Sequence, residues 1–219
     1  MNKRIVLVLT ILTAFTLGAF SQNNMTLGVN AGYDYNSAYL VDIDGADNMN
    51  QIPDFNVGVD VGLEFGERIR ARVELKYVNI SFERDFAYTG NDLDIDYSKI
   101  SVNNLNLNPR FDYRLFSIKN FDTYITTGLR LEFTAGDYIR TYRNDGSKSD
   151  LRYFGGSGRY VHKSVMTGAI GGFIFKYNVN EKLGITVSPE YTSFFTRFYK
   201  QNDMAMQRAN VNVGIEWTF

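Results

Sequence analysis

Strict alternation of apolar and polar residues is the feature that most constrains this chain. From Phe55 to Phe65 every odd position is apolar, and every even position is Asn, Asp, Glu or Gly. Successive side chains of a β-strand point to opposite faces, so this segment predicts a strand with one apolar and one polar face. No window after Gln22 has a sustained helical period. The alternation therefore predicts an all-β protein.

Segments of this kind recur along the chain, each close to the ~9–11 residues that a tilted strand needs to cross a bilayer. The eight segments are 25–35, 55–65, 69–77, 105–115, 121–133, 165–177, 183–191 and 209–219. The connections between them alternate in length. Short ones are 66–68, 117–120 and 178–182, and long ones are 36–54, 83–99, 136–163 and 196–206. This pattern predicts an eight-stranded antiparallel transmembrane β-barrel with short periplasmic turns and long extracellular loops.

The first residues have the layout of a secretory signal peptide. Lys3 and Arg4 precede an apolar run over 5–17, and Ala19-Phe20-Ser21 forms a small-x-small cleavage site. The run is shorter than the ~20 residues of a transmembrane helix. We therefore expect a signal peptide over 1–21, cleavage near Ser21/Gln22, and a barrel domain over 22–219 in the bacterial outer membrane.

Composition excludes several classes of function. The chain has no Cys, which rules out disulfides and Cys-based metal sites, and its formal charge of −1 gives no reason to expect nucleic acid. The acidic run over 92–96 lacks the Gly and the closing Glu of a calcium-binding EF-hand loop. We expect no cofactor and no metal.

The polar face of the alternating segments is rich in charge of both signs. An eight-stranded barrel has an interior just wide enough for side chains to fill, and buried charges must be paired. We therefore expect a lumen network that plugs the barrel, in which Arg72 and Arg130 each pair with carboxylates. The alternative is a narrow solute channel, which favours one sign of charge along a constriction. The predicted network is Asp60, Glu64, Arg70, Arg72, Glu74, Lys76, Arg110, Asp112, Arg114, Arg130, Glu132, Glu190 and Glu216, with Asp34, Lys176 and Arg208 on the same face.

Aromatic residues cluster where the strands meet the short turns, as in the interfacial girdles of outer-membrane barrels. The predicted girdle is Phe65, Tyr113, Phe175, Tyr177, Trp217 and Phe219. In a closed barrel the last strand pairs with the first, which holds the end of the strand that finishes at Phe219.

Two irregularities interrupt the pattern. Pro109 and Pro189 lie inside predicted strands, where proline removes a ladder donor, so we interpret both as β-bulges with the ring facing lipid. After Tyr77 the apolar positions change parity to Val78 and Ile80. We expect a bulge there, or a strand that emerges above the membrane.

One short motif suggests enzyme chemistry. His162 and Ser164 lie on one strand face, a spacing that resembles the His-x-Ser of outer-membrane lipid A deacylases. An imidazole base beside a hydroxyl nucleophile is a plausible hydrolytic pair. The resemblance covers three residues. It gives an alternative to a non-enzymatic barrel, namely an outer-leaflet lipid A-modifying hydrolase.

The long connections differ in charge. Residues 36–54 carry acids and no base, whereas 136–163 is rich in Arg, Lys and Tyr. We expect these loops either to pair with each other over the barrel mouth or to form a surface for a protein partner.

The cleavage site before Gln22, the Asn108-Pro109 strand and the terminal Trp217-Thr218-Phe219 resemble the Bacteroidetes-type outer-membrane β-barrel family that includes PorT-like proteins. This resemblance implies a non-enzymatic barrel, structural or accessory to a secretion or surface complex. The terminal Phe219 also resembles the signal that the outer-membrane insertion machinery reads.

Overall fold

The computed structural model describes residues 25–40, 49–85, 95–152, 164–196 and 204–219. No helix among these residues is long and apolar enough to cross a membrane. The strands are β1 (Met25–Leu40), β2 (Met49–Ile52), β3 (Asp54–Phe65), β4 (Ile69–Asp85), β5 (Ile95–Ile118), β6 (Phe121–Arg143), β7 (Lys148–Arg152), β8 (Val165–Asn178), β9 (Leu183–Phe194) and β10 (Met204–Thr218).

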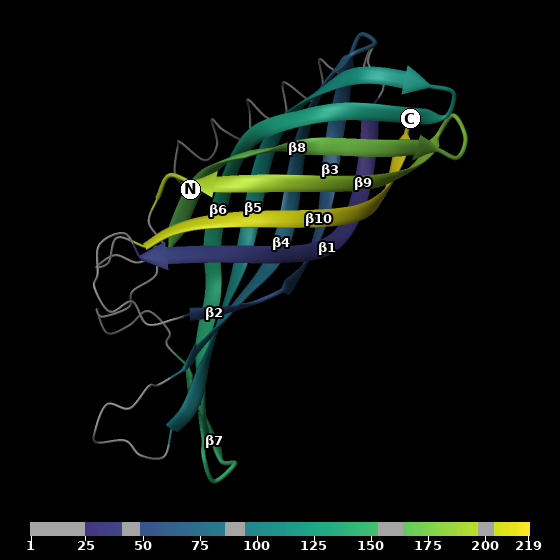
Figure 1. Ribbon diagram of the computed structural model, residues 1–219. Coiled ribbons are helices and arrows are strands. Elements are labelled where there is room, and N and C mark those ends of the chain that lie inside the picture. Colours follow the sequence, from purple (N-terminus) through teal and green to yellow (C-terminus); the bar gives the residue numbers. More distant parts are fainter. Residues whose placement is uncertain (1–24, 41–48, 86–94, 153–163, 197–203) are drawn as a thin grey trace, which may run out of the picture.

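Eight of these strands close into one antiparallel barrel (Figure 1). Their order around the wall is β1, β3, β4, β5, β6, β8, β9 and β10, and β10 pairs again with β1. Each strand thus satisfies its backbone hydrogen bonds on both sides, as a barrel in lipid requires. The predicted all-β, eight-stranded barrel is confirmed.

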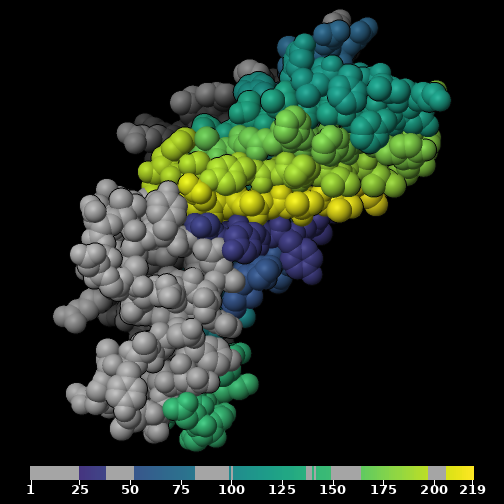
Figure 2. Space-filling view, viewed as in Figure 1, coloured from purple at the N-terminus to yellow at the C-terminus, as the bar shows by residue number. Residues whose placement is uncertain are grey.

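Alternating burial separates two faces on every barrel strand. In β3, Asn56 and Asp60 are buried, whereas Val57, Val59 and Val61 are about half exposed on the outer wall. A one-residue slip would turn the charged set into lipid, so the alternation fixes the register. Figure 2 shows β8, β9 and β10 as adjacent bands, from green to yellow, on one outer face of the barrel.

The end of β10 is held on both sides. Trp217 pairs with Leu27 of β1 and with Leu183 of β9. The Phe219 amide donates to the Met25 carbonyl at 2.9 Å, and the Thr218 amide donates to the Lys182 carbonyl at 2.8 Å. Barrel closure therefore explains why the alternation continues to the last residues.

Strand pairing continues past the barrel at the long-loop end. β5 has 24 residues and β6 has 23, and together they form an arm that carries β7 (Figure 1). β4 pairs with β5 as far as Asp85↔Tyr97, and β2 pairs with the same part of β4. Parts of the predicted loops 36–54, 83–99 and 136–163 are therefore strands, because neighbouring strands extend each other's ladders beyond the membrane.

The parity change after Tyr77 is not a bulge. β4 stays in register with β5 throughout, and Val78 and Ile80 are buried on the same inward face as Lys76. The inward face itself becomes apolar near the long-loop end, and the strand then emerges from the barrel.

The prediction of bulges at the two prolines is wrong. β5 and β6 have the same register on either side of Pro109, and β8 and β9 on either side of Pro189, although the ladders lack bridges there. Both prolines are half buried on the outward parity. Each prolyl carbonyl packs against a glycine of the next strand, Gly128 or Gly172, where a Cβ would collide with it. Each glycine pairs with the residue after the proline, Arg110 or Glu190, and leaves room for the prolyl carbonyl without an extra residue in the strand.

Candidate functional site in the barrel lumen

The lumen holds most of the predicted charge network. Glu64 and Arg114 lie only half buried, toward the short turns. Asp54 and Asp122 are buried but were not predicted, although Asp122 continues the inward parity of β6. The predicted residues that the structure places in the buried interior are Asp34, Asp60, Arg70, Arg72, Glu74, Lys76, Arg110, Asp112, Arg130, Glu132, Lys176, Glu190, Arg208 and Glu216.

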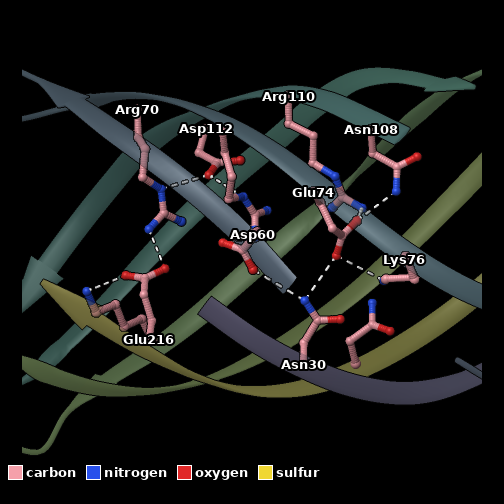
Figure 3. Close-up of polar contacts among 12 residues, drawn as sticks. Asn30, Asp60, Arg70, Glu74, Lys76, Asn108, Arg110, Asp112 and Glu216 are labelled. Carbon is pink, nitrogen blue, oxygen red and sulfur yellow. Dashed lines mark hydrogen bonds and ion pairs between the residues drawn. The ribbon is translucent and has the colours of Figure 1, made fainter. Parts of the chain in front are cut away.

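A chain of ion pairs crosses the lumen nearest the short turns (Figure 3). The Glu216 carboxylate accepts hydrogen bonds from Arg70 at 2.5 Å and from Lys176 at 2.6 Å. Arg70 also donates to Asp112 at 2.9 Å, and Arg72 lies 3.2 Å from the same carboxylate. These residues come from β4, β5, β8 and β10, so the chain joins strands that are not neighbours in the wall.

Arg110 occupies the middle of the network. Its guanidinium, 1% exposed, reaches Glu74 on β4 and Glu190 on β9, with a further contact of 3.2 Å to Glu190 Oε2. Glu74 also accepts from Asn108 at 2.7 Å and lies 3.1 Å from Lys76. One arginine therefore joins three strands through two carboxylates, as a planar five-donor side chain can.

Asparagines supply many of the remaining donors. Asn210 donates to Glu190 at 2.9 Å, and Asn30 donates to Glu74 at 3.1 Å (Figure 3). The sequence-based prediction of the network considers only charged residues, so it omits these asparagines. Their inward parity beside each carboxylate is the signal that identifies them.

Apolar side chains join the network at the long-loop end. Arg208 donates to Glu132 at 2.6 Å and to Asn36 at 2.6 Å, and its guanidinium lies 5.3 Å from the centroid of the Phe194 ring. Polar Asn36, Asp54 and Asn104 are also buried at this end. The buried apolar residues beside them are Val78, Ile80, Val102, Met166, Phe194 and Met206.

Arg130 departs from the prediction that it pairs with carboxylates. Its side chain is 0% exposed, and its Nε, Nη1 and Nη2 atoms have no hydrogen-bond partner among the described residues. The reason is competition, because the Glu132 carboxylate is occupied by Arg208 and Asn104. Arg72, by contrast, has its carboxylate partners in Asp112 and Asp60.

The residues of the predicted girdle all point outward at the short-turn end. Phe65, Tyr113, Tyr177, Trp217 and Phe219 are exposed. Phe175 is half buried, and its ring stacks on Phe121 and Phe173 with centroids 6.3 Å apart in each pair.

Only one residue of the predicted hydrolytic pair lies within the described ranges. His162 lies outside them, and Ser164 is exposed just before β8, where its carbonyl accepts from the Thr134 amide at 3.0 Å. The acidic residues 92–94 also lie outside the described ranges. Within those ranges, no group of three or more His, Asp or Glu side chains is placed to hold a metal ion.

The arm carries exposed polar groups outside the barrel. Lys148 lies over the Tyr142 ring at 5.2 Å. Hydrogen bonds from the side chain and the backbone of Ser147 lower the pKa of the exposed Asp145 carboxyl.

A family model describes almost the whole chain. The model of the outer membrane protein beta-barrel domain matches residues 7–219. The chain belongs to this family. Its lipid-facing wall is therefore in contact with the bacterial outer membrane, and the short turns are periplasmic. No curated protein sequence matches the chain.

Solved outer-membrane proteins resemble the structure. OprG from Pseudomonas aeruginosa aligns with a TM-score of 0.50 at 15% identity, over 89% of this chain and 95% of OprG. Neisserial surface protein A aligns with a TM-score of 0.49 at 12% identity, over 90% of this chain and 100% of that protein. The outer membrane enzyme PagL aligns with a TM-score of 0.45 at 9% identity, over 86% of this chain and 97% of PagL. At these identities the likeness concerns the fold.

Proposed function

We propose that this outer-membrane barrel is a closed, non-enzymatic scaffold, structural or accessory to a secretion or surface complex. The observation that carries the proposal is the lumen network, in which Arg110 joins Glu74 and Glu190 from separate walls. An eight-stranded interior filled in this way leaves no aqueous path of the kind found in wide barrels. The resemblance to PorT-like proteins supports the accessory role.

The purified wild-type protein is expected to give no steady conductance in planar bilayers, because paired side chains fill the lumen and buried apolar side chains narrow its long-loop end. Single-channel recording checks this, with a wide outer-membrane porin as a positive control. Stable, ion-selective openings would establish the solute-channel alternative instead.

The proposed signal peptide is tested on the same sample. The intact mass is expected to match residues 22–219, since the signal peptide is removed before Gln22.

The arm is the part of this scaffold best placed to contact a protein partner. Its strands β5, β6 and β7 extend beyond the barrel (Figure 1), and the sequences of β6 and β7 contain polar and aromatic residues there. The loops 36–54 and 136–163 leave the barrel at the same end. We propose that this end recruits the partner and that the barrel serves as its anchor in the membrane.

Shortening the arm tests this role. Tyr138 pairs directly with Arg152, so residues 139–151 can be replaced by an Asn-Gly turn that preserves the pairing. Wild-type protein solubilised from outer membranes is expected to migrate on native gels as a larger complex, which the shortened chain loses. Heat-modifiable migration serves as the folding control. A complex of unchanged size in the shortened chain would reject the arm as the partner surface.

A further inference from the structure

A groove of about 490 Å³ lies in the outer wall of the barrel, outside the lumen. It runs over β4, β5, β6 and β8, between the exposed side chains of Phe111, Ile125 and Phe173. Its floor is formed at Thr127 and Gly171. These two residues are neighbours across the β6–β8 ladder, and Phe111 pairs with Thr127 on the other side. The groove exists because a glycine and a threonine stand in a row of otherwise large side chains.

Packing does not require the glycine at position 171. A Cβ there would have the Thr126 carbonyl oxygen as its nearest neighbour, at an ordinary contact distance of 3.8 Å, and the backbone is extended. Glycine weakens a strand interior, and it often marks a place where another molecule approaches closely. The open groove is therefore a feature that the fold could have filled without strain.

A cationic group lies at the periplasmic end of the groove. Tyr113 lines this end, and its hydroxyl accepts a hydrogen bond from Arg68 Nη1 at 3.3 Å. Arg68 belongs to the short turn before β4, and its carbonyl accepts from the Arg114 amide at 2.8 Å, which ties the turn to β5. Arg68 is exposed in this short turn. Such a group is suited to bind a phosphate.

We propose that this groove binds one phospholipid of the periplasmic leaflet. Its acyl chain lies between Phe111 and Phe173 over Gly171, and its phosphate binds Arg68 beside the Tyr113 hydroxyl. The apolar part of the groove faces the hydrocarbon band, and the cation lies where headgroups begin, so one lipid matches both ends. A second copy of the chain is the alternative occupant of the apolar part, since its short turns carry the exposed acids Glu67 and Glu181. The experiment below distinguishes the two occupants.

Native mass spectrometry of protein extracted from outer membranes in a mild detergent tests the site. Wild-type protein is expected to retain one phospholipid, and Gly171→Phe is expected to lose it because the ring fills the groove. Gly171→Ala controls for loss of the glycine. Val59→Phe controls for an added ring on the opposite lipid-facing wall, where Val59 is 48% exposed. Both controls are expected to retain the lipid.

The cationic end has its own variant. Arg68→Gln is expected to lower the fraction of protein that keeps the lipid through a detergent wash, while leaving the barrel folded. Equal retention in Gly171→Phe and wild type would overturn the proposal, and so would a wild-type protein without bound lipid. A wild-type dimer that Gly171→Phe converts to monomer would assign the groove to a second copy. If Gly171→Phe fails to show heat-modifiable migration, Gly171→Leu replaces it.

Discussion

Replacing Arg110 with alanine is expected to lower the free energy of unfolding in lipid by about 3–5 kcal/mol, the usual cost of breaking a buried ion pair. Arg110 bonds to both Glu74 and Glu190. Glu74 keeps its ion pair with Lys76 in the variant, whereas the hydrogen bonds that Glu190 keeps among the described residues come from the amides of Asn210 and Asn212. Equilibrium unfolding in denaturant, with the protein in lipid vesicles, measures the loss.

Arg130→Met is the matched control, since Arg130 is equally buried but has no partner among the described residues. Removing it leaves no carboxylate without its cation and removes a desolvated charge, so we expect a change within about 1 kcal/mol or a gain in stability. A second substitution, Glu190→Gln, is expected to restore part of the stability lost in Arg110→Ala. Equal losses in Arg110→Ala and Arg130→Met would contradict the network as described.

Replacing Gly172 with alanine is expected to destabilise the barrel by about 1–3 kcal/mol or more, the range for overpacking. A Cβ at this position would collide with the Pro189 carbonyl oxygen and lie 2.9 Å from the Glu190 Cα atom. Both neighbours are backbone atoms of β9, so they cannot rotate away. Relief requires β8 and β9 to separate next to the central ion pairs.

The adjacent residue provides the control. Gly171→Ala adds the same methyl group on the outward face, where its nearest contact is 3.8 Å, and it is expected to be neutral or to stabilise by about 0.5 kcal/mol. Thermal unfolding and the yield of folded, heat-modifiable protein distinguish the two variants. If Gly171→Ala is as damaging as Gly172→Ala, the prolyl carbonyl is not the reason for the glycine.

Period-two alternation determined the barrel and the face that each side chain takes. Asp60, Glu74 and Arg110 were placed inward because a strand has no other way to segregate polar from apolar residues in lipid. The alternation of short and long connections indicated the closure and the orientation. Both signals are local or nearly so, which is why they can be read from the chain.

Pairing across the lumen was decided only by the tertiary structure. Arg110 and Glu190 are 80 positions apart, and Arg70 and Glu216 are 146 apart. Parity states that such residues face the same interior, but not which cation reaches which carboxylate. Arg130 shows the consequence. Arg208 forms the ion pair with Glu132, and the sequence pattern does not predict which of the two arginines does so.

Register likewise separated what the sequence determined from what it did not. Proline in a strand predicted a disturbance at Pro109 and Pro189, but its form depended on the neighbouring strand. Gly128 pairs with Arg110 and Gly172 with Glu190, one residue after each proline, and both leave room for the prolyl carbonyl. The ladders keep their register on either side. The amino-acid sequence by itself specified which face of each strand is buried, since that depends on adjacent residues. The tertiary structure decided the partners, the arm and the groove, since these depend on the shear that aligns distant strands.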